Sequence, residues 1–303
     1  MRSVILIHIV LMSLIVISCG EKIPSPTAVI SAALDSGVVK FSIETTDAET
    51  FEWDFGDGSE VATVENPQHV FPEYGKTYSV ILKATGPGGT TICNYEMVIP
   101  AATMMQSLTG GVLHGGNRKW RVNRNSKIYV VKPDNSFTVI DEWTADKLNT
   151  MGFSNLFLDE YQFFVDGSYA IIPKTDRIIT GLQYCLSKSI PNEPPTDLAS
   201  DNGLTLTRYL QPMSLSYGLN ESKDLTLAIV EGQQLKNITF CDVSTISFSR
   251  GGFLGIMDWE SECLMKEITE KEMVVTLFFS DVPSGEPFRG RINKAFILRF
   301  EAV

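Results

Sequence analysis

Hydrophobic and polar positions alternate over short stretches through most of the chain, as in the segment FEWDF. Phe51, Trp53 and Phe55 share one parity, whereas Glu52 and Asp54 share the other. Successive side chains of a β-strand point to opposite faces, so one face of this strand is expected to be core and the other solvated. The pattern therefore predicts a half-buried strand.

Turn signals separate such strands throughout residues 28–100. Gly56, Asp57 and Gly58 follow the FEWDF strand directly, and glycine supplies the positive φ that tight hairpins need. About seven strand patterns occur in roughly seventy residues here, which predicts an immunoglobulin-like sandwich. Asp57 is expected to make a turn hydrogen bond, Asp54 to hold a neighbouring loop, and His69 to be a packed structural residue beside the Trp53 sheet.

Residues 110–303 also alternate strand patterns with polar loops, after a linker or short helix at 101–109. Asp166-Gly167-Ser168 lies between apolar arms and predicts a hairpin, whereas residues 144–152 predict a helix that begins at a Thr cap and ends at Gly152. About ten strands in some 190 residues predict one large antiparallel β-sandwich, with jelly-roll topology as the favoured arrangement. The chain is thus expected to be all-β.

The N-terminal eighteen residues, MRSVILIHIVLMSLIVIS, carry one Arg and then a continuous apolar stretch. This stretch is short for a permanent transmembrane helix and predicts a secretory signal. Its end, with Ser18 before Cys19, resembles the bacterial lipobox, which implies lipidation of Cys19. The alternative is an ordinary signal peptide with an incidental cysteine. A lipidated Cys19, followed by a tether at 19–27, would anchor the protein to a membrane.

Net charge argues against a nucleic-acid partner. The 303 residues carry a formal charge of −11 and no run of basic residues, so the chain repels polyanions. The cysteines beyond Cys19 are Cys93, Cys185, Cys241 and Cys263. They form no C-x-x-C pair, which disfavours zinc. Disulfides among the last three and free buried thiols both stay open.

Motifs for catalysis or metal binding are lacking. Beyond the signal, histidine occurs only at His69 and at His114, which lies in a glycine-rich turn. The sequence has no G-x-S-x-G, H-E-x-x-H or P-loop pattern, and Gly110-Gly111 and Gly115-Gly116 are expected to be loop glycines. A calcium loop starting at Asp54 fails because Gly56 stands at its third position. We expect no metal and no cofactor.

Glycoside hydrolases use two carboxyl groups that lie close together, and the sequence offers three pairs of acids as candidates. Asp141-Glu142 and Asp159-Glu160 are adjacent residues, which face opposite sides of a regular strand. Asp258 and Glu260 share parity and flank Trp259, so they are the best catalytic pair. An ordinary polar strand end is the favoured interpretation, and no enzyme activity is expected.

Exposed aromatic rings are the usual platforms for sugars. Trp143 and Trp259 each stand beside polar residues, so both are expected on loops, as candidate ligand-binding residues together with Asp258 and Glu260. Burial in a core is the alternative for both tryptophans. Trp120 lies in a strand pattern and is expected in the core. Tyr184, Tyr209 and Tyr217 are weaker candidates.

The first predicted domain resembles the PKD (polycystic kidney disease) family. WDFGDGS and then ENPQHVFPEYGKTYSVILKATGPGG match the family's pattern in order, over about residues 27–100. The resemblance implies a non-catalytic spacer or adhesion module. It gives structural roles to the motif residues Trp53, Asp54, Phe55, Gly56, Asp57, Gly58, His69 and Tyr78.

The remainder resembles the sandwich domain that follows PKD modules in Bacteroidetes lipoproteins, through LTGG, RKW, W-T-A and LDEYQFFVDGSY. This resemblance implies a surface glycan-binding partner of a polysaccharide uptake system, held at the outer membrane by Cys19. The chain departs from that pattern: Arg118-Lys119-Trp120 lacks a Thr, Trp143 stands alone where a Trp pair is usual, and a G-H-F-G-x-G segment is missing. The expected function is non-catalytic polysaccharide capture. The alternatives are an adhesion or structural module that binds an outer-membrane protein, and a glycoside hydrolase.

Overall fold

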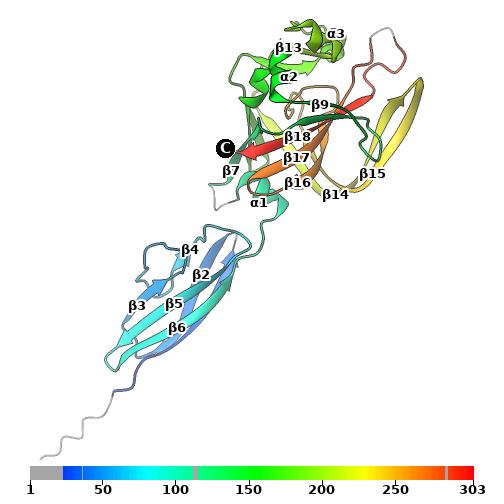
Figure 1. Ribbon diagram of the computed structural model, residues 1–303. Coiled ribbons are helices and arrows are strands. Elements are labelled where there is room, and N and C mark those ends of the chain that lie inside the picture. Colours follow the sequence, from blue (N-terminus) through cyan, green and yellow to red (C-terminus); the bar gives the residue numbers. More distant parts are fainter. Residues whose placement is uncertain (1–22, 36, 112–114, 284–285) are drawn as a thin grey trace, which may run out of the picture. The chain divides into compact units, whose positions relative to one another are not determined.

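A computed structural model describes residues 23–35, 37–111, 115–283 and 286–303 (Figure 1). The stretch expected to be a secretory signal, Cys19 and His114 lie outside these ranges. The chain divides into two compact units, one of residues up to 69 and 77–98, and the other of residues 70–76 and 99–303.

The first unit is an immunoglobulin-like sandwich of two antiparallel sheets, with strand orders β1-β2-β4 and β3-β5-β6. Its strands are β1 (Thr27–Asp35), β2 (Val38–Thr46), β3 (Thr50–Asp54), β4 (Gln68–His69), β5 (Thr77–Gly86) and β6 (Gly89–Val98). The alternation predicted for FEWDF is confirmed. Trp53 is fully buried and Phe55 nearly so, whereas Glu52 and Asp54 are exposed.

In the sequence, β6 is followed by α1 (Met104–Thr109), which lies within the residues predicted as a linker. The Thr103 side chain accepts from the N–H of Gln106, and the Gln106 side chain accepts from the N–H of Thr103. This reciprocal capping box satisfies two free N–H groups at the start of a short helix.

The second unit contains an antiparallel sheet with the strand order β17-β16-β15-β14-β11-β10-β7-β18-β8-β9. Its strands are β7 (Asn117–Val122), β8 (Ile128–Val131), β9 (Val139–Trp143), β10 (Glu160–Phe164), β11 (Ser168–Ile172), β14 (Leu215–Glu231), β15 (Gln234–Phe248), β16 (Glu262–Ile268), β17 (Glu272–Phe279) and β18 (Lys294–Ala302).

This sheet curls round until β17, its first strand, pairs with β18 as well as with β16, and β8 and β9 extend beyond this junction (Figure 1). Opposite walls then face each other across the core as the layers of a sandwich. Jelly-roll topology was the wrong expectation for this unit. A jelly roll is built from two Greek keys, whereas these strands pair mostly in chain order, interrupted by β8–β9 and by β12–β13.

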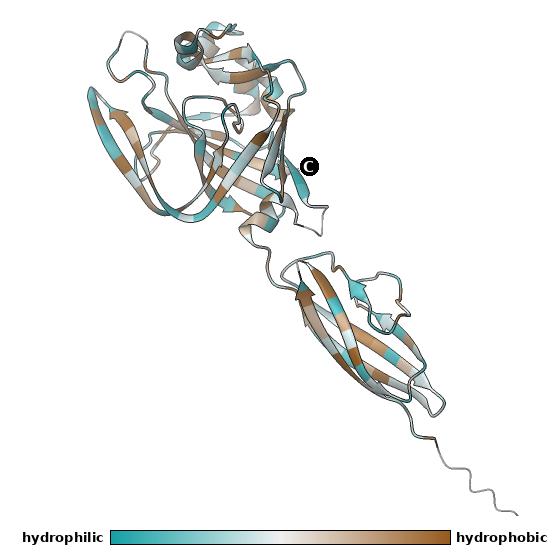
Figure 2. Cartoon of the chain, turned by 180° about the vertical axis from the view of Figure 1, so that it is seen from behind, coloured by the Kyte–Doolittle hydropathy of each residue, from teal (hydrophilic) through white to brown (hydrophobic). Residues whose placement is uncertain are grey.

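Strand β17 is buried on both faces, from Met273 to Phe279. Leu277 and Phe279 point into the main core, and Phe278 belongs to a second apolar cluster. That cluster also contains Leu225, Leu227, Ile229 and Phe240 from the outer half of the β14–β15 hairpin. Figure 2 shows apolar and polar residues alternating along this hairpin. The hairpin therefore lays its own apolar face on the outside of the sheet.

Smaller elements complete the second unit. These are α2 (Ala145–Thr150), the 3-10 turn η2 (Ser154–Phe157), β12 (Arg177–Gly181), α3 (Leu182–Lys188), α4 (Asp197–Asp201) and β13 (Leu204–Arg208). Helix α2 confirms the prediction for 144–152, because the Thr144 side chain accepts from the N–H of Lys147 and Gly152 has φ +85°. Strands β8, β12 and β16 and helices α3 and α4 were not predicted.

Candidate functional site

The aromatic residues of the WDFGDG motif build the core of the first unit. Trp53 packs 5.4 Å from Phe41, ring centroid to ring centroid, and donates from Nε1 to the carbonyl of Val64. Gly56 has φ +73°, and a β-carbon there would lie 2.4 Å from the carbonyl oxygen of Ser79. Only glycine fits that position without a shift of backbone. Tyr78, a further motif residue, is also buried.

Asp57 is the centre of a polar cluster at the motif turn. Its carboxylate accepts from the N–H and hydroxyl of Ser59 and lies 2.7 Å from Nε2 of His69. Burial acts to raise the pKa of Asp57, but the hydrogen bonds from Ser59 and His69 outweigh it and hold the pKa below its usual range. These contacts give Asp57 the turn role predicted for it.

His69 also stacks on Phe55, with ring centroids 3.9 Å apart. Its strand β4 pairs with β2, in the sheet opposite the one that holds Trp53, and the stacking on Phe55 makes His69 the packed residue that was expected beside that sheet. Asp54 accepts from the N–H of Gly56 within its own turn, rather than holding another loop.

Trp143 is not on a loop, contrary to the sequence expectation. It ends strand β9 with 1% of its surface exposed, and its ring packs 5.1 Å from Phe296. Its Nε1 donates to Asp141, which also pairs with Lys147. The polar neighbours that suggested a loop thus serve to satisfy the buried indole, and the ring offers no platform for a ligand. Trp120 is fully buried, as expected.

Trp259 lies in a loop between Met257 and β16, as predicted, and is partly exposed. Its ring makes an edge contact with Tyr184 at 5.4 Å, and Nζ of Lys188 lies 5.2 Å from its centroid. Gly290 packs against the ring so closely that a β-carbon there would lie 3.2 Å from it. Trp259 is therefore held in place on several sides while part of it reaches solvent.

Asp258 takes a structural position beside this tryptophan. Its Oδ2 accepts from the N–H of Ser280 at 2.6 Å, and its Oδ1 is buried against Gly181 without a hydrogen-bond partner among the described residues. Although part of the residue reaches solvent, this enclosure of the carboxyl raises its pKa well above the ordinary value, and nearby Asp281 and Glu260 act in the same direction.

Glu260 points elsewhere. Its Oε1 accepts from the N–H groups of Ser261 and Glu262, and burial raises its pKa. The segment is a loop and not the strand that the parity argument assumed, since β16 begins at Glu262. Glu260 lines an open hollow that Asp258 does not line. The two acids therefore do not flank a common space as a hydrolytic pair would.

This hollow, the Trp259 hollow, has a volume of about 510 Å³. Its walls come from strands β14 and β15, from the Trp259 loop and from the segment before β18; the lining includes Thr226, Asn237, Trp259, Glu260, Gly290 and Arg291. Asn237 and Arg291 are both exposed. Within the described residues, neither side chain has a hydrogen bond or ion pair. An aromatic ring, an amide, a guanidinium and a carboxyl thus share one concavity.

Sequence reasoning found Trp259 and Glu260 but missed Asn237 and Arg291. Asn237 and Arg291 lie far apart in the sequence, and they come together only because the β14–β15 hairpin folds over the sheet. Asn237 stands among the polar residues of a half-exposed strand, where nothing distinguishes it. No local pattern could have selected either residue.

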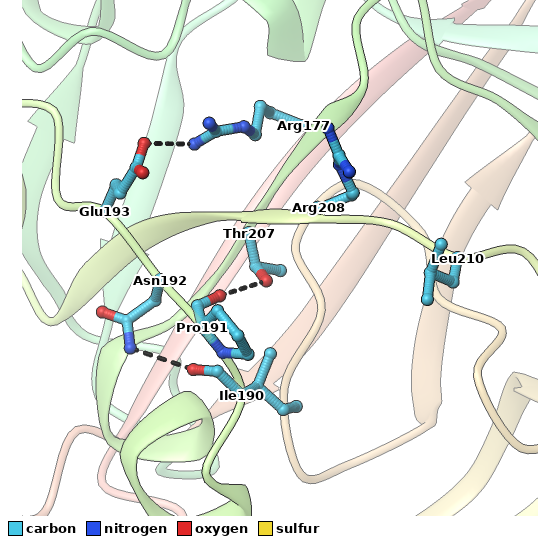
Figure 3. Close-up of a pocket in the computed structure, with 8 residues that line it drawn as sticks. All are labelled: Arg177, Ile190, Pro191, Asn192, Glu193, Thr207, Arg208 and Leu210. Atoms are coloured by element: carbon cyan, nitrogen blue, oxygen red, sulfur yellow. Dashed lines mark hydrogen bonds and ion pairs between the residues drawn. The ribbon is translucent and has the colours of Figure 1, made fainter.

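A second concavity, the Arg177 pocket, lies where β12 and β13 meet the chain after α3 and measures about 440 Å³ (Figure 3). Arg177 and Arg208 face each other in register across the two strands. Arg177 pairs with Glu193 at 2.5 Å, and Arg208 pairs with Asp176 at 3.2 Å. Because its charges already neutralise each other and no aromatic ring lines it, this pocket is the weaker candidate.

The four cysteines beyond Cys19 are free thiols in the structure, which decides a question that the sequence left open. Cys185 and Cys263 are buried, and burial raises the pKa of both thiols. Groups of three or more His, Cys, Asp or Glu that could hold a metal ion are not found in the described ranges. In the same ranges, no helix has the length and apolar character needed to cross a membrane.

Comparison with known proteins concerns the first unit. Residues 23–99 match the PKD domain family. Among solved structures, the PKD1 domain of Epp from Vibrio anguillarum shares 25% identity, covering 25% of this chain and 96% of that one, with a TM-score of 0.21. No curated protein matches the chain. By the family match, residues 23–99 of the chain form a PKD domain.

Proposed function

We propose that the protein is an exported, non-catalytic lipoprotein whose second unit captures a polysaccharide at the Trp259 hollow. The observation that carries the proposal is the composition of that hollow. Sugar rings stack on indole faces, while amide, guanidinium and carboxyl groups bond their hydroxyls. Trp259, Asn237, Arg291 and Glu260 supply this set in one concavity.

The raised pKa of Glu260 fits the same chemistry. A carboxyl that keeps its proton more readily can donate a hydrogen bond as well as accept one, and sugar hydroxyls do both. Gly290 lies against one face of the indole, and any larger residue there would press on that face.

The rest of the chain suits a protein held at a membrane. Cys19 would carry the lipid at the outer membrane, residues 19–27 would form the tether, and the PKD domain would act as a spacer. The ligand-binding unit would then face the exterior.

The proposal is tested by affinity electrophoresis of the protein in gels containing β-glucan, xylan, galactomannan, pectin or α-mannan. We expect at least one polysaccharide to retard the wild type. Trp259→Ala should lose about tenfold or more in affinity, which corresponds to about 1.4 kcal/mol. Trp143→Phe, a change in the core, should bind as wild type does. Absence of retardation with every polysaccharide would contradict the proposal.

A protein partner is the second candidate, favoured by exposed apolar side chains in the segment after β13. Leu210 is 82% exposed and Met213 fully exposed, and exposed apolar groups of this kind occur at interfaces. A stable complex with an outer-membrane protein that Leu210→Ser disrupts, without retardation by any glycan, would favour this candidate. Release of reducing sugar that depends on Glu260 would instead favour a hydrolase.

A further inference from the structure

Two hollows, not one, lie along the same strand of the β14–β15 hairpin. The Trp259 hollow includes Thr226 and Ala228 of β14. The next one, the Phe288 hollow, has a volume of about 450 Å³; its lining includes Val230, Gln233, Asp281, Pro287 and Phe288. Successive parts of one extended strand therefore border successive hollows.

Among the described residues, one backbone contact separates the two hollows. Ile229 and Ile292 form an isolated parallel bridge, and the N–H of Val230 donates to the carbonyl of Ile292 at 2.7 Å. The segment before β18 thus touches the outer half of β14 at one place, with a hollow on either side. Figure 1 shows this segment running beside the hairpin.

The edge of β14 offers backbone groups to a ligand. In an antiparallel pair, the N–H and C=O of alternate residues point away from the partner strand. Since the N–H of Val230 points away from β15 toward Ile292, the backbone groups of Ala228 and Thr226 also point to this side. No described residue makes a hydrogen bond to them, so the Trp259 hollow presents strand-edge donors and acceptors.

One turn presents a residue to each hollow. The N–H of Arg291 donates to the carbonyl of Phe288 at 2.9 Å, so the turn places Phe288 in one hollow and Arg291 in the other. Phe288 has φ +71°, a left-handed conformation that is costly for a residue with a β-carbon. Backbone strain of this kind concentrates at functional sites. Its ring is partly exposed.

We infer that the site takes an extended, linear oligosaccharide, with one sugar unit in the Trp259 hollow and a later unit in the Phe288 hollow. This inference rests on the proposed function. An aromatic ring in each hollow provides two stacking surfaces, and β14 runs past both hollows in the direction proposed for the ligand. A single sugar could occupy only one of them.

The test measures the affinity of size-fractionated oligosaccharides, prepared by partial hydrolysis of the polysaccharide that retards the wild type. Phe288→Gly removes the ring and keeps the turn, because glycine adopts a positive φ without strain. We expect wild-type affinity to rise with length until both hollows are filled. Phe288→Gly should remove about tenfold from the affinity for long oligosaccharides and leave short ones within about twofold, and Phe288→Tyr should restore the length dependence.

Control variants separate the inference from the proposed function. Trp259→Ala should weaken binding at every length, and Leu235→Ala, on the same hairpin but outside both hollows, should change nothing. If Trp259→Ala abolishes binding while Phe288→Gly binds every length as wild type does, the function stands and the second subsite is wrong. A wild-type affinity that does not depend on oligosaccharide length would also contradict the second subsite. If no polysaccharide binds, the proposed function and the second subsite are both wrong.

Discussion

Asp258 shows how strongly a single enclosed carboxyl can couple the fold to pH. Its pKa is raised well above the ordinary value, chiefly by burial. The folded protein therefore holds a proton at this position that the unfolded chain releases above about pH 4. Where the folded state binds more protons, stability falls as pH rises.

Asp258→Asn should remove this dependence. At pH 8 the variant should melt at a higher temperature than the wild type, because no charge has to be excluded from the enclosed site. Near pH 3, where both forms are neutral, the two melting temperatures should converge. Thermal unfolding followed by circular dichroism across this range checks the expectation. A wild type that gains stability from pH 4 to 8 relative to the variant would contradict it.

At this scale the sequence predicted the FEWDF strand well but could not separate Trp143 from Trp259. Both stand beside acids, and both were expected on loops. The difference lies in partners distant in sequence. Phe296 covers Trp143 from β18, whereas Gly290 and α3 leave Trp259 partly open. A side chain's burial depends on contacts that local pattern does not contain.

Among the elements, the β14–β15 hairpin decides where the candidate site lies. Phe240 is buried on its outer half, stacked on Phe137 with ring centroids 5.1 Å apart and lying 5.8 Å from Phe278. These contacts hold the hairpin over β17. Without them the walls of the Trp259 hollow would separate.

Phe240→Ala should therefore lower the free energy of unfolding by about 3–5 kcal/mol, as for other buried Phe→Ala changes. Leu235→Ala on the same hairpin, where the side chain is 44% exposed, should stay within about 0.5 kcal/mol of wild type. Urea unfolding gives both values. Equal losses for the two variants would show that the second apolar cluster does not stabilise the hairpin.

Element prediction succeeded where the signal was local. The Asp166-Gly167-Ser168 hairpin is found: the Asp166 carboxylate accepts from the N–H and hydroxyl of Ser168, and Gly167 has φ +84°. The unbroken apolar character of β17 could not be explained from the sequence, because each face of the strand meets a different core. Strand β16 was missed because its residues do not alternate regularly.

At the scale of the whole molecule, the two units have separate cores. Trp53 is fully buried in the first and Trp120 in the second. Calorimetry of the wild type should then show two unfolding transitions.

Trp53→Ala should lower the transition of the PKD domain, by about 3–5 kcal/mol in free energy, and leave the other transition and glycan retardation unchanged. Trp120→Ala should lower the transition of the second unit, leave that of the PKD domain unchanged, and abolish glycan retardation. A single transition that both variants shift alike would show that the units unfold as one.

The closed sheet of the second unit can form only after the last strand of that unit has been synthesised. Strand β18 pairs with β7, and the Arg121–Glu301 ion pair joins residues 180 positions apart. During synthesis, β7 emerges long before its neighbour exists, so its free edge stays available to other strands until the end of the domain is translated. We expect the pairing of β18 with β7, which closes the sheet, to be the last and slowest event in the folding of this unit.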